Sequence, residues 1–96
     1  MSESEKHEPT RIDIKIGDEE MKGRYSNVVR VVHTREEFIL DFLHVVPPQG
    51  IVTARVITSP GHLKRIVQAL TANLARYEEA HGPIVLAEGP EIKGVH

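Results

Sequence analysis

One long helical pattern, placed after every segment with strand character, sets the main constraint on how this chain folds. In residues 59–82, apolar side chains recur every three or four residues, as in a helix with one apolar face. Ser59 and Pro60 suit the start of a helix, and Gly82 followed by Pro83 suits its end. A single helix can cover only one face of a sheet, so the other face needs a partner. The apolar stripe consists of Leu63, Ile66, Val67, Leu70, Leu74 and Tyr77.

Four segments before the helix have the character of strands. Residues 11–16 alternate strictly between isoleucine and charged side chains, as a half-buried strand does. Residues 24–33, 38–46 and 51–58 are rich in Val, Ile, Leu or Phe and are separated by turn sequences. This order predicts an α+β fold, with a four-stranded antiparallel sheet followed by one C-terminal amphipathic helix (β-β-β-β-α).

The length of 96 residues predicts one domain with short tails. Residues 1–10 are polar and unpatterned, and we expect a disordered tail there. Residues 11–86 form the single α+β domain, in which the apolar residues 84–86 tuck against the body. Residues 87–96 contain glycine and proline, and we expect a flexible tail.

Two turn sequences set the pairing of the last three strands. A turn near residues 34–37 allows pairs whose numbers sum to 71, and the Pro-Pro-Gln-Gly turn at 47–50 allows pairs that sum to 96. Both registers align apolar residues, and a slip of one residue would turn every side chain to the wrong face. They place Phe42 and Val52 on the face that the helix covers, and Ile51 on the opposite face.

The sheet face away from the helix is too apolar to be left in water. Valine, leucine and isoleucine side chains follow it along three strands, with Leu43 among them. A body this small also buries only ~60% of its unfolded surface, which favours assembly. We therefore expect a homo-oligomer, most simply a homodimer, in which a second copy covers this face.

The same registers bring three charged side chains together on the face away from the helix. Asp41 on the central strand lies between Arg30 and Arg55. Two guanidinium groups can share a bound carboxylate or phosphate, which would make the cluster a ligand site. Alternatively, the three residues form an ion triad within an oligomer interface. We favour the triad, because Asp41 already occupies the acceptor position between the arginines.

A second candidate is a polar rim, where the strands end and the helix begins. His33 and His62 lie near each other in the expected topology, with Glu37 close by. Two imidazoles and a carboxylate can bind zinc or transfer protons. Their spacing matches no known ligand motif, so we expect no metal and no cofactor. The chain has no cysteine and no Ser-His-Asp spacing, and we expect no enzymatic activity.

Charge and hydropathy limit the classes of partner. The net charge is −2, but the acidic excess lies in the two tails, and the body carries ten basic and nine acidic side chains. A duplex-DNA binder needs a dense basic face instead. No apolar run exceeds four residues, so we expect no membrane span and no secretory signal. These features predict a bacterial-style cytoplasmic protein.

Several short motifs resemble a family of short, uncharacterised prokaryotic proteins known only as a domain of unknown function. The resemblance covers roughly three quarters of the chain, nearly the whole single-domain body expected at this length. It implies a small conserved domain and transfers no catalytic residue and no ligand. The matching features are Tyr25-Ser26-Asn27, the stretch from Glu37-Phe38 to Asp41-Phe42, the helix start Ser59-Pro60-x-His62-x-Lys64-Arg65, and Asn73, Tyr77-Glu78 and Gly82.

We expect a small non-catalytic homodimeric binding or adaptor module with an unknown protein partner. The alternative is a single-stranded nucleic-acid-binding protein, by analogy with β-β-β-β-α dimers of the transcription-coactivator, Whirly and Pur types. Such proteins stack bases on exposed aromatic side chains. Here the aromatic residues fall on the helix-covered face or in the helix stripe, so any nucleic-acid binding should be weak. A small enzyme or metal protein centred on His33 and His62 ranks last.

Overall fold

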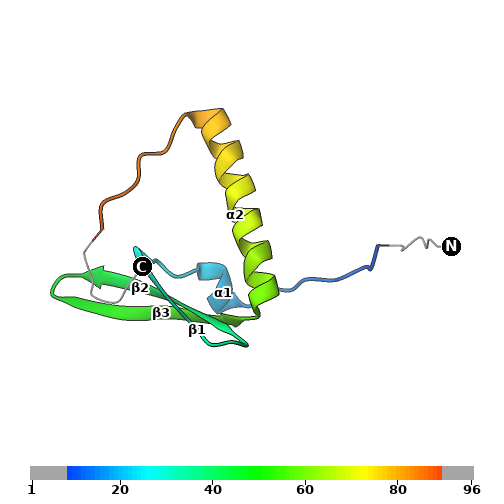
Figure 1. The fold of residues 1–96 in the computed structure, drawn as a ribbon, viewed down its shortest axis with the longest axis horizontal. Coiled ribbons are helices and arrows are strands. Elements are labelled where there is room, and N and C mark those ends of the chain that lie inside the picture. Colours follow the sequence, from blue (N-terminus) through cyan, green and yellow to red (C-terminus); the bar gives the residue numbers. More distant parts are fainter. Residues whose placement is uncertain (1–8, 90–96) are drawn as a thin grey trace.

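The computed structural model describes residues 9–89, in which a three-stranded antiparallel sheet is followed by one long helix (Figure 1). The strands follow one another as a meander, with the second strand in the centre. The structure thus confirms an α+β fold with an antiparallel sheet and a C-terminal helix, but the described sheet has three strands instead of four. The elements are α1 (Asp18–Lys22), β1 (Val28–His33), β2 (Phe38–Val46), β3 (Gln49–Thr58) and α2 (Pro60–His81).

The hairpin between β1 and β2 closes through Thr34. Its backbone N–H donates to the Glu37 carbonyl at 2.9 Å, and its hydroxyl accepts from the N–H groups of Glu36 and Glu37, each at 3.2 Å. The two strands then pair with residue numbers that sum to 71, so that Val29 faces Phe42. The predicted register is confirmed along the whole of β1.

The pairing of β2 with β3 follows the predicted register only as far as Phe42. A bulge then shifts the pairing by one residue, so that Leu43 faces Val52. Thr53 is the extra residue, and its hydroxyl donates to the Phe42 carbonyl at 3.0 Å. Because facing residues share one side of a sheet, Val52 lies on the Leu43 face and Ile51 lies on the other. The prediction for these two residues is wrong, because turn chemistry and apolar alternation do not reveal a bulge.

The N-terminal segment does not form the predicted fourth strand. Residues 11–16 lie outside any strand, and Ile12, Ile14 and Ile16 are 70%, 88% and 57% exposed. Alternating apolar and charged side chains are typical of a strand at a sheet edge. A strand forms, however, only where its backbone hydrogen-bonds to a neighbouring strand. The following residues form α1, in which three acidic residues in the first turn and Lys22 in the last complement the helix macrodipole.

Asn27 extends the pairing of β1 and β2 beyond the end of β1. Its backbone N–H donates to the Leu43 carbonyl at 3.0 Å. Its side-chain amide donates to the Val45 carbonyl at 2.9 Å and accepts from the Val45 N–H at 2.8 Å. The Ser26 hydroxyl lies 3.1 Å from the Leu43 carbonyl as well. The side chain of Asn27 therefore replaces a backbone partner and holds the end of β2 in place.

α2 begins and ends where the sequence predicts. The Ser59 hydroxyl accepts from the His62 N–H at 3.2 Å, and the Ser59 carbonyl accepts from the Leu63 N–H at 2.9 Å. At the other end, the Gly82 N–H donates to the Glu78 carbonyl at 2.8 Å. Gly82 has a φ of 93°, a conformation that glycine adopts without strain.

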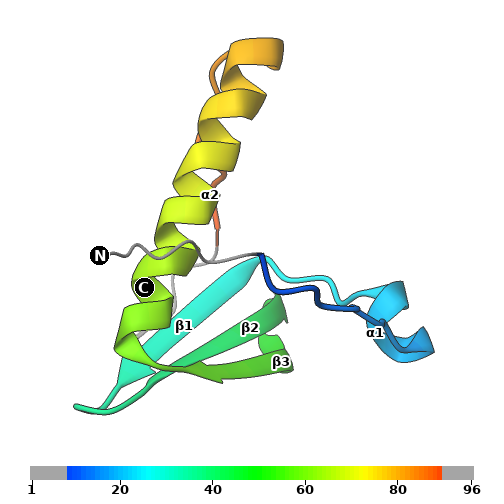
Figure 2. The same ribbon diagram turned by 90° about the vertical axis from the view of Figure 1, so that its right-hand side faces the viewer.

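α2 rises from the end of β3 and stands clear of the sheet along most of its length (Figure 1 and Figure 2). Its apolar side chains Leu63 and Ile66, in the first two turns, are half-buried. The prediction that the apolar stripe of α2 packs on the sheet is therefore wrong. The side chains beyond these turns are 54% (Val67), 60% (Leu70), 54% (Leu74) and 53% (Tyr77) exposed.

The connection between β3 and α2 explains why the helix does not lie on its own sheet. Ser59 is the only residue between the two elements, and Pro60 restricts the backbone directly after it. A helix that folds back over its strand is usually joined to it by a loop of about 2–6 residues. With one linking residue, α2 leaves the sheet in the direction that the end of β3 sets.

The buried interior is small. It lies on the sheet face away from the helix, which we expected a second copy of the chain to cover. Asp41, Leu43 and Val45 alternate along β2 and are 1%, 9% and 8% exposed. That face is therefore already protected at these positions within one chain. The radius of gyration is 17.8 Å, well above the ~12.5 Å of a compact domain of this length. The stripe of α2 is more exposed than these positions, and at the margins of the Leu43 face Val32, Val52 and Ile57 are also 46%, 41% and 54% exposed.

The described residues that follow α2 do not pack against the fold. Ile84, Val85 and Leu86 are 45%, 88% and 90% exposed, so the expectation that residues 84–86 tuck against the body is wrong. The tails predicted at residues 1–10 and 87–96 lie largely outside the described residues.

Replacing Asn27 with alanine tests the side-chain extension of the sheet. We expect Asn27→Ala to lower the free energy of unfolding by about 1–2 kcal/mol, because two backbone groups of Val45 lose their partners. Urea unfolding followed by circular dichroism measures the change. Gln68→Ala removes an amide from the exposed side of α2 and should change stability by no more than about 0.5 kcal/mol. Equal stability of Asn27→Ala and the wild type would contradict this role.

Candidate functional site

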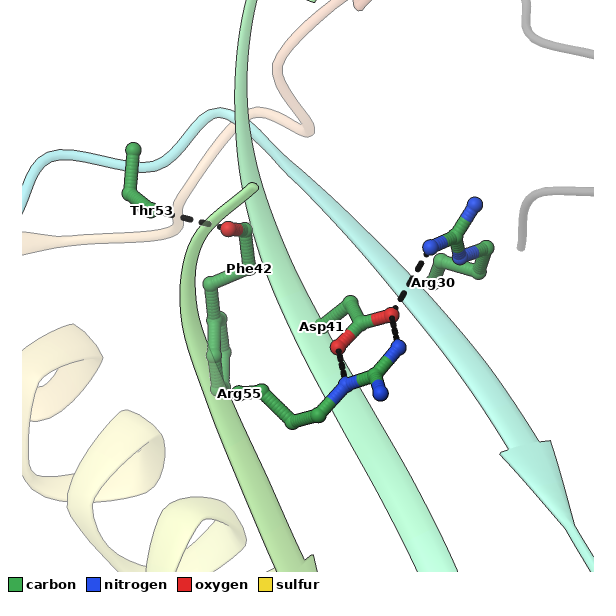
Figure 3. A network of polar contacts seen from close by, with 5 residues as sticks. All are labelled: Arg30, Asp41, Phe42, Thr53 and Arg55. Carbon is green, nitrogen blue, oxygen red and sulfur yellow. Dashed lines mark hydrogen bonds and ion pairs between the residues drawn. The ribbon is translucent and has the colours of Figure 1, made fainter. Parts of the chain in front are cut away.

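Three neighbouring strands each supply one charged side chain to a cluster on one face of the sheet. Arg30 on β1 faces Asp41 on β2, and Asp41 faces Arg55 on β3. Phe42, the next residue of β2, points to the opposite side of the strand (Figure 3). The registers predicted from the turns hold at these positions, so the structure brings together all three residues that the sequence singled out.

Asp41 accepts three hydrogen bonds from the two arginines. Arg55 donates from Nε to Oδ1 at 2.7 Å and from Nη2 to Oδ2 at 2.9 Å, which makes a two-pronged pair. Arg30 donates from Nη2 to Oδ2 at 2.8 Å. The Asp41 side chain is 1% exposed, whereas those of Arg30 and Arg55 are 38% and 55% exposed. The carboxylate is thus buried beneath two guanidinium groups that reach solvent.

The cluster strongly favours the ionised form of Asp41. The hydrogen bonds from Arg55 and then from Arg30 hold the pKa of Asp41 well below its usual range, although burial acts in the opposite direction. The hydrogen bond to Asp41 and its charge raise the pKa of Arg55. A carboxylate that stays ionised at neutral pH does not donate protons there, so this geometry does not suit Asp41 to general acid catalysis.

The cluster keeps some capacity to bind an anion. A guanidinium has five N–H donors, and the described contacts with Asp41 use two from Arg55 and one from Arg30. Asp41, however, occupies the point between the arginines where a bound carboxylate or phosphate would be held by both. The arrangement therefore favours the ion triad over a shared anion site, and its place in an oligomer interface remains a prediction.

The predicted polar rim is not assembled into a common site by any described contact. His33 lies against Phe38, with ring centroids 5.1 Å apart, and the Glu37 carbonyl closes the turn with Thr34. His62 donates its backbone N–H to the helix cap. Within residues 9–89, no group of three or more histidine, aspartate or glutamate side chains is placed to hold a metal ion.

The exposure of Tyr25 and of the stripe of α2 was not predicted from the sequence. The aromatic residues outside the helix stripe were expected on the helix-covered face, but Tyr25 is 67% exposed and its ring meets that of His44 edge-on at 5.0 Å. The stripe borders a shallow hollow of about 540 Å³ near the C-terminal end of α2. Leu70, Leu74 and Tyr77 line it together with Ile84. The short link at Ser59 was the available signal for an uncovered helix.

Comparison with known protein families identifies the family of this chain. A family model described as a protein of unknown function, DUF3467, matches residues 1–86. The chain belongs to this family. No curated protein and no solved structure matches the DUF3467 chain. No helix among its described residues is both long and apolar enough to cross a membrane.

The pH dependence of stability tests the cluster. The pKa of Asp41 is lowered in the folded chain, so its contribution is complete above the unfolded value, near pH 4, and is lost as the pH falls below that. We expect Asp41→Asn to lower the urea midpoint of unfolding at pH 7. The difference in midpoint between this variant and the wild type should narrow as the pH falls below about 4. Asp13→Asn, in the exposed N-terminal segment, serves as the control. A gap that stays constant down to pH 2 would contradict the pairing.

The two arginines should differ in importance. Lysine keeps the positive charge but cannot form the two-pronged contact that Arg55 makes with Asp41. We expect Arg55→Lys to lower the urea midpoint at pH 7 more than Arg30→Lys, because Arg30 donates a single hydrogen bond. The reverse order would mean that charge, rather than hydrogen-bond geometry, holds the cluster together.

Proposed function

We propose that the DUF3467 chain is a small non-catalytic homodimeric binding or adaptor module. One observation carries the proposal: the apolar stripe of α2 is more than half exposed in the single chain, from Val67 to Tyr77. Fully burying one such side chain stabilises a protein by about 1.5–3 kcal/mol, so leaving a whole row in water is costly. A second copy would cover the stripe and complete the fold.

The chemistry of the cluster supports a binding role over a catalytic one. Asp41 is the buried charged residue of the described chain, and Arg30 and Arg55 keep it ionised and paired. The half-exposed arginines can contact an acidic group on a partner at the edge of the cluster. We also propose that the protein is prokaryotic, as its resemblance to short prokaryotic proteins implies, and that it is cytoplasmic, since a chain without cysteine needs no oxidising compartment.

Sedimentation velocity at micromolar concentration tests the homodimer. We expect the wild type to sediment as a dimer and Leu74→Glu to sediment as a monomer, because a charge in the stripe would be desolvated on association. Gln68→Glu places the same charge on the side of α2 away from the stripe and should leave the dimer intact. A folded wild-type monomer would refute the homodimer.

Affinity capture from the native organism tests the binding role. The purified wild-type chain should retain a protein partner, and nuclease treatment should not release it. Arg30→Ala or Arg55→Ala should reduce the amount of partner that is retained. Partners that disappear with nuclease would favour the alternative, a protein that binds single-stranded nucleic acid.

The exposure of Tyr25 gives that alternative one specific support, because single-strand binders stack bases on such rings. Arg24 precedes it in the sequence and carries a positive charge, which lies 3.7 Å from the Glu19 carboxylate. Fluorescence anisotropy with a single-stranded oligonucleotide at physiological salt provides the test. Tight binding that Tyr25→Ala abolishes would replace the adaptor proposal.

A further inference from the structure

The apolar side chains of α2 follow the spacing of a two-helix seam. From Leu63 onward, the positions advance by four, three, four, three and four residues, the repeat of seven that keeps a/d side chains on one partner helix. Five of the six side chains are apolar or aromatic, and the rings of Tyr77 and His81 lie 4.8 Å apart at the end of the row. The seam consists of Leu63, Val67, Leu70, Leu74, Tyr77 and His81.

Charges beside the seam are arranged against the dipole of α2. Lys64 and Arg65 lie near its N-terminus and Glu78 and Glu79 near its C-terminus, and the first turn has no acidic residue. Each placement is unfavourable for a lone helix, because the macrodipole prefers anions at the start and cations at the end. A partner helix that runs in the opposite direction would set acidic residues beside the basic end and basic residues beside the acidic end.

We propose that α2 pairs antiparallel with α2 of a second copy of this chain. This inference rests on the proposed homodimer and specifies its interface. Leu70 then packs against the partner's Leu74, and Val67 against the partner's Tyr77. In the same alignment, Lys64 lies beside the partner's Glu78, because both occupy the flanking position that antiparallel helices bring together.

Two observations on the described residues favour a second copy as the occupant of this surface. The hollow beside Leu74, Tyr77 and Ile84 offers a place for the apolar first half of the partner's α2. The single linking residue Ser59 keeps α2 off its own sheet. A parallel pair would bring the two basic ends together, which like-charge repulsion disfavours.

Charge reversal tests this geometry. Lys64 and Glu78 are 14 residues apart on one helix, about 21 Å, so they cannot pair within a chain. We expect K64E and E78K each to weaken the dimer roughly tenfold in Kd at low salt, because two attractions become two repulsions. Mixed in equal amounts, K64E and E78K chains should form a heterodimer that restores both attractions.

The controls are R65E and E79K, which make the same charge changes on the outward side of α2. E78K also removes the hydrogen bond that the Glu78 carboxylate accepts from the Ile84 N–H at 2.9 Å, so recovery of the dimer on mixing with K64E is the deciding result. Both should dimerise like the wild type, alone and when mixed. The weakening by K64E and E78K should also fade in 1 M salt, which screens exposed charges.

The outcomes separate this inference from the proposed function. A wild-type monomer refutes both. A wild-type dimer that Leu74→Glu leaves intact keeps the homodimer and overturns the α2 interface. A dimer that Leu74→Glu breaks, but in which K64E and E78K form no preferred heterodimer, overturns the antiparallel pairing alone.

Discussion

The buried carboxylate of Asp41 is the interaction on which the sheet depends. It lies on the central strand and takes hydrogen bonds from Arg30 on one neighbour and Arg55 on the other. A slip of one residue in either hairpin would turn one arginine to the opposite face and leave the buried charge short of a partner. The cluster therefore specifies both registers together, which is a role in selecting the fold as much as in stabilising it.

The placement of a charged residue at the buried centre of the sheet limits the stability of the sheet. The Asp41 carboxylate occupies the most protected point of the described chain, where other small domains place large apolar side chains, and its desolvation offsets part of the attraction to the two arginines. Leu43 and Val45 are the buried apolar residues of the described chain. Other apolar side chains of the sheet, such as Val29, Leu40 and Phe42, are half-buried, whereas the stripe of α2 from Val67 to Tyr77 contributes little until something covers it.

The sequence predicted the elements whose signals are local. Ser59, Pro60 and Gly82 mark the ends of α2, and the two turns determine the registers up to Phe42. The bulge at Thr53 and the unpaired state of residues 11–16 depend on how distant segments meet, which periodicity does not record. The direction of α2 follows from the single linking residue Ser59, which the helical pattern by itself does not reveal. The ion cluster was predictable because Arg30, Asp41 and Arg55 follow from the registers alone.

The open geometry of α2 follows from the link at Ser59, and it relates folding to assembly. A helix that cannot return to its own sheet keeps its apolar stripe in water as long as the chain is alone. Isolated helices gain little stability from propensity and depend on packing of the apolar face. In α2, this packing would have to come from outside the chain, and the charges at both ends oppose its own dipole. On the proposed antiparallel pairing, one contact between two copies would cover the stripe, match the charges and stabilise the helix, so folding of α2 and dimerisation would become a single step.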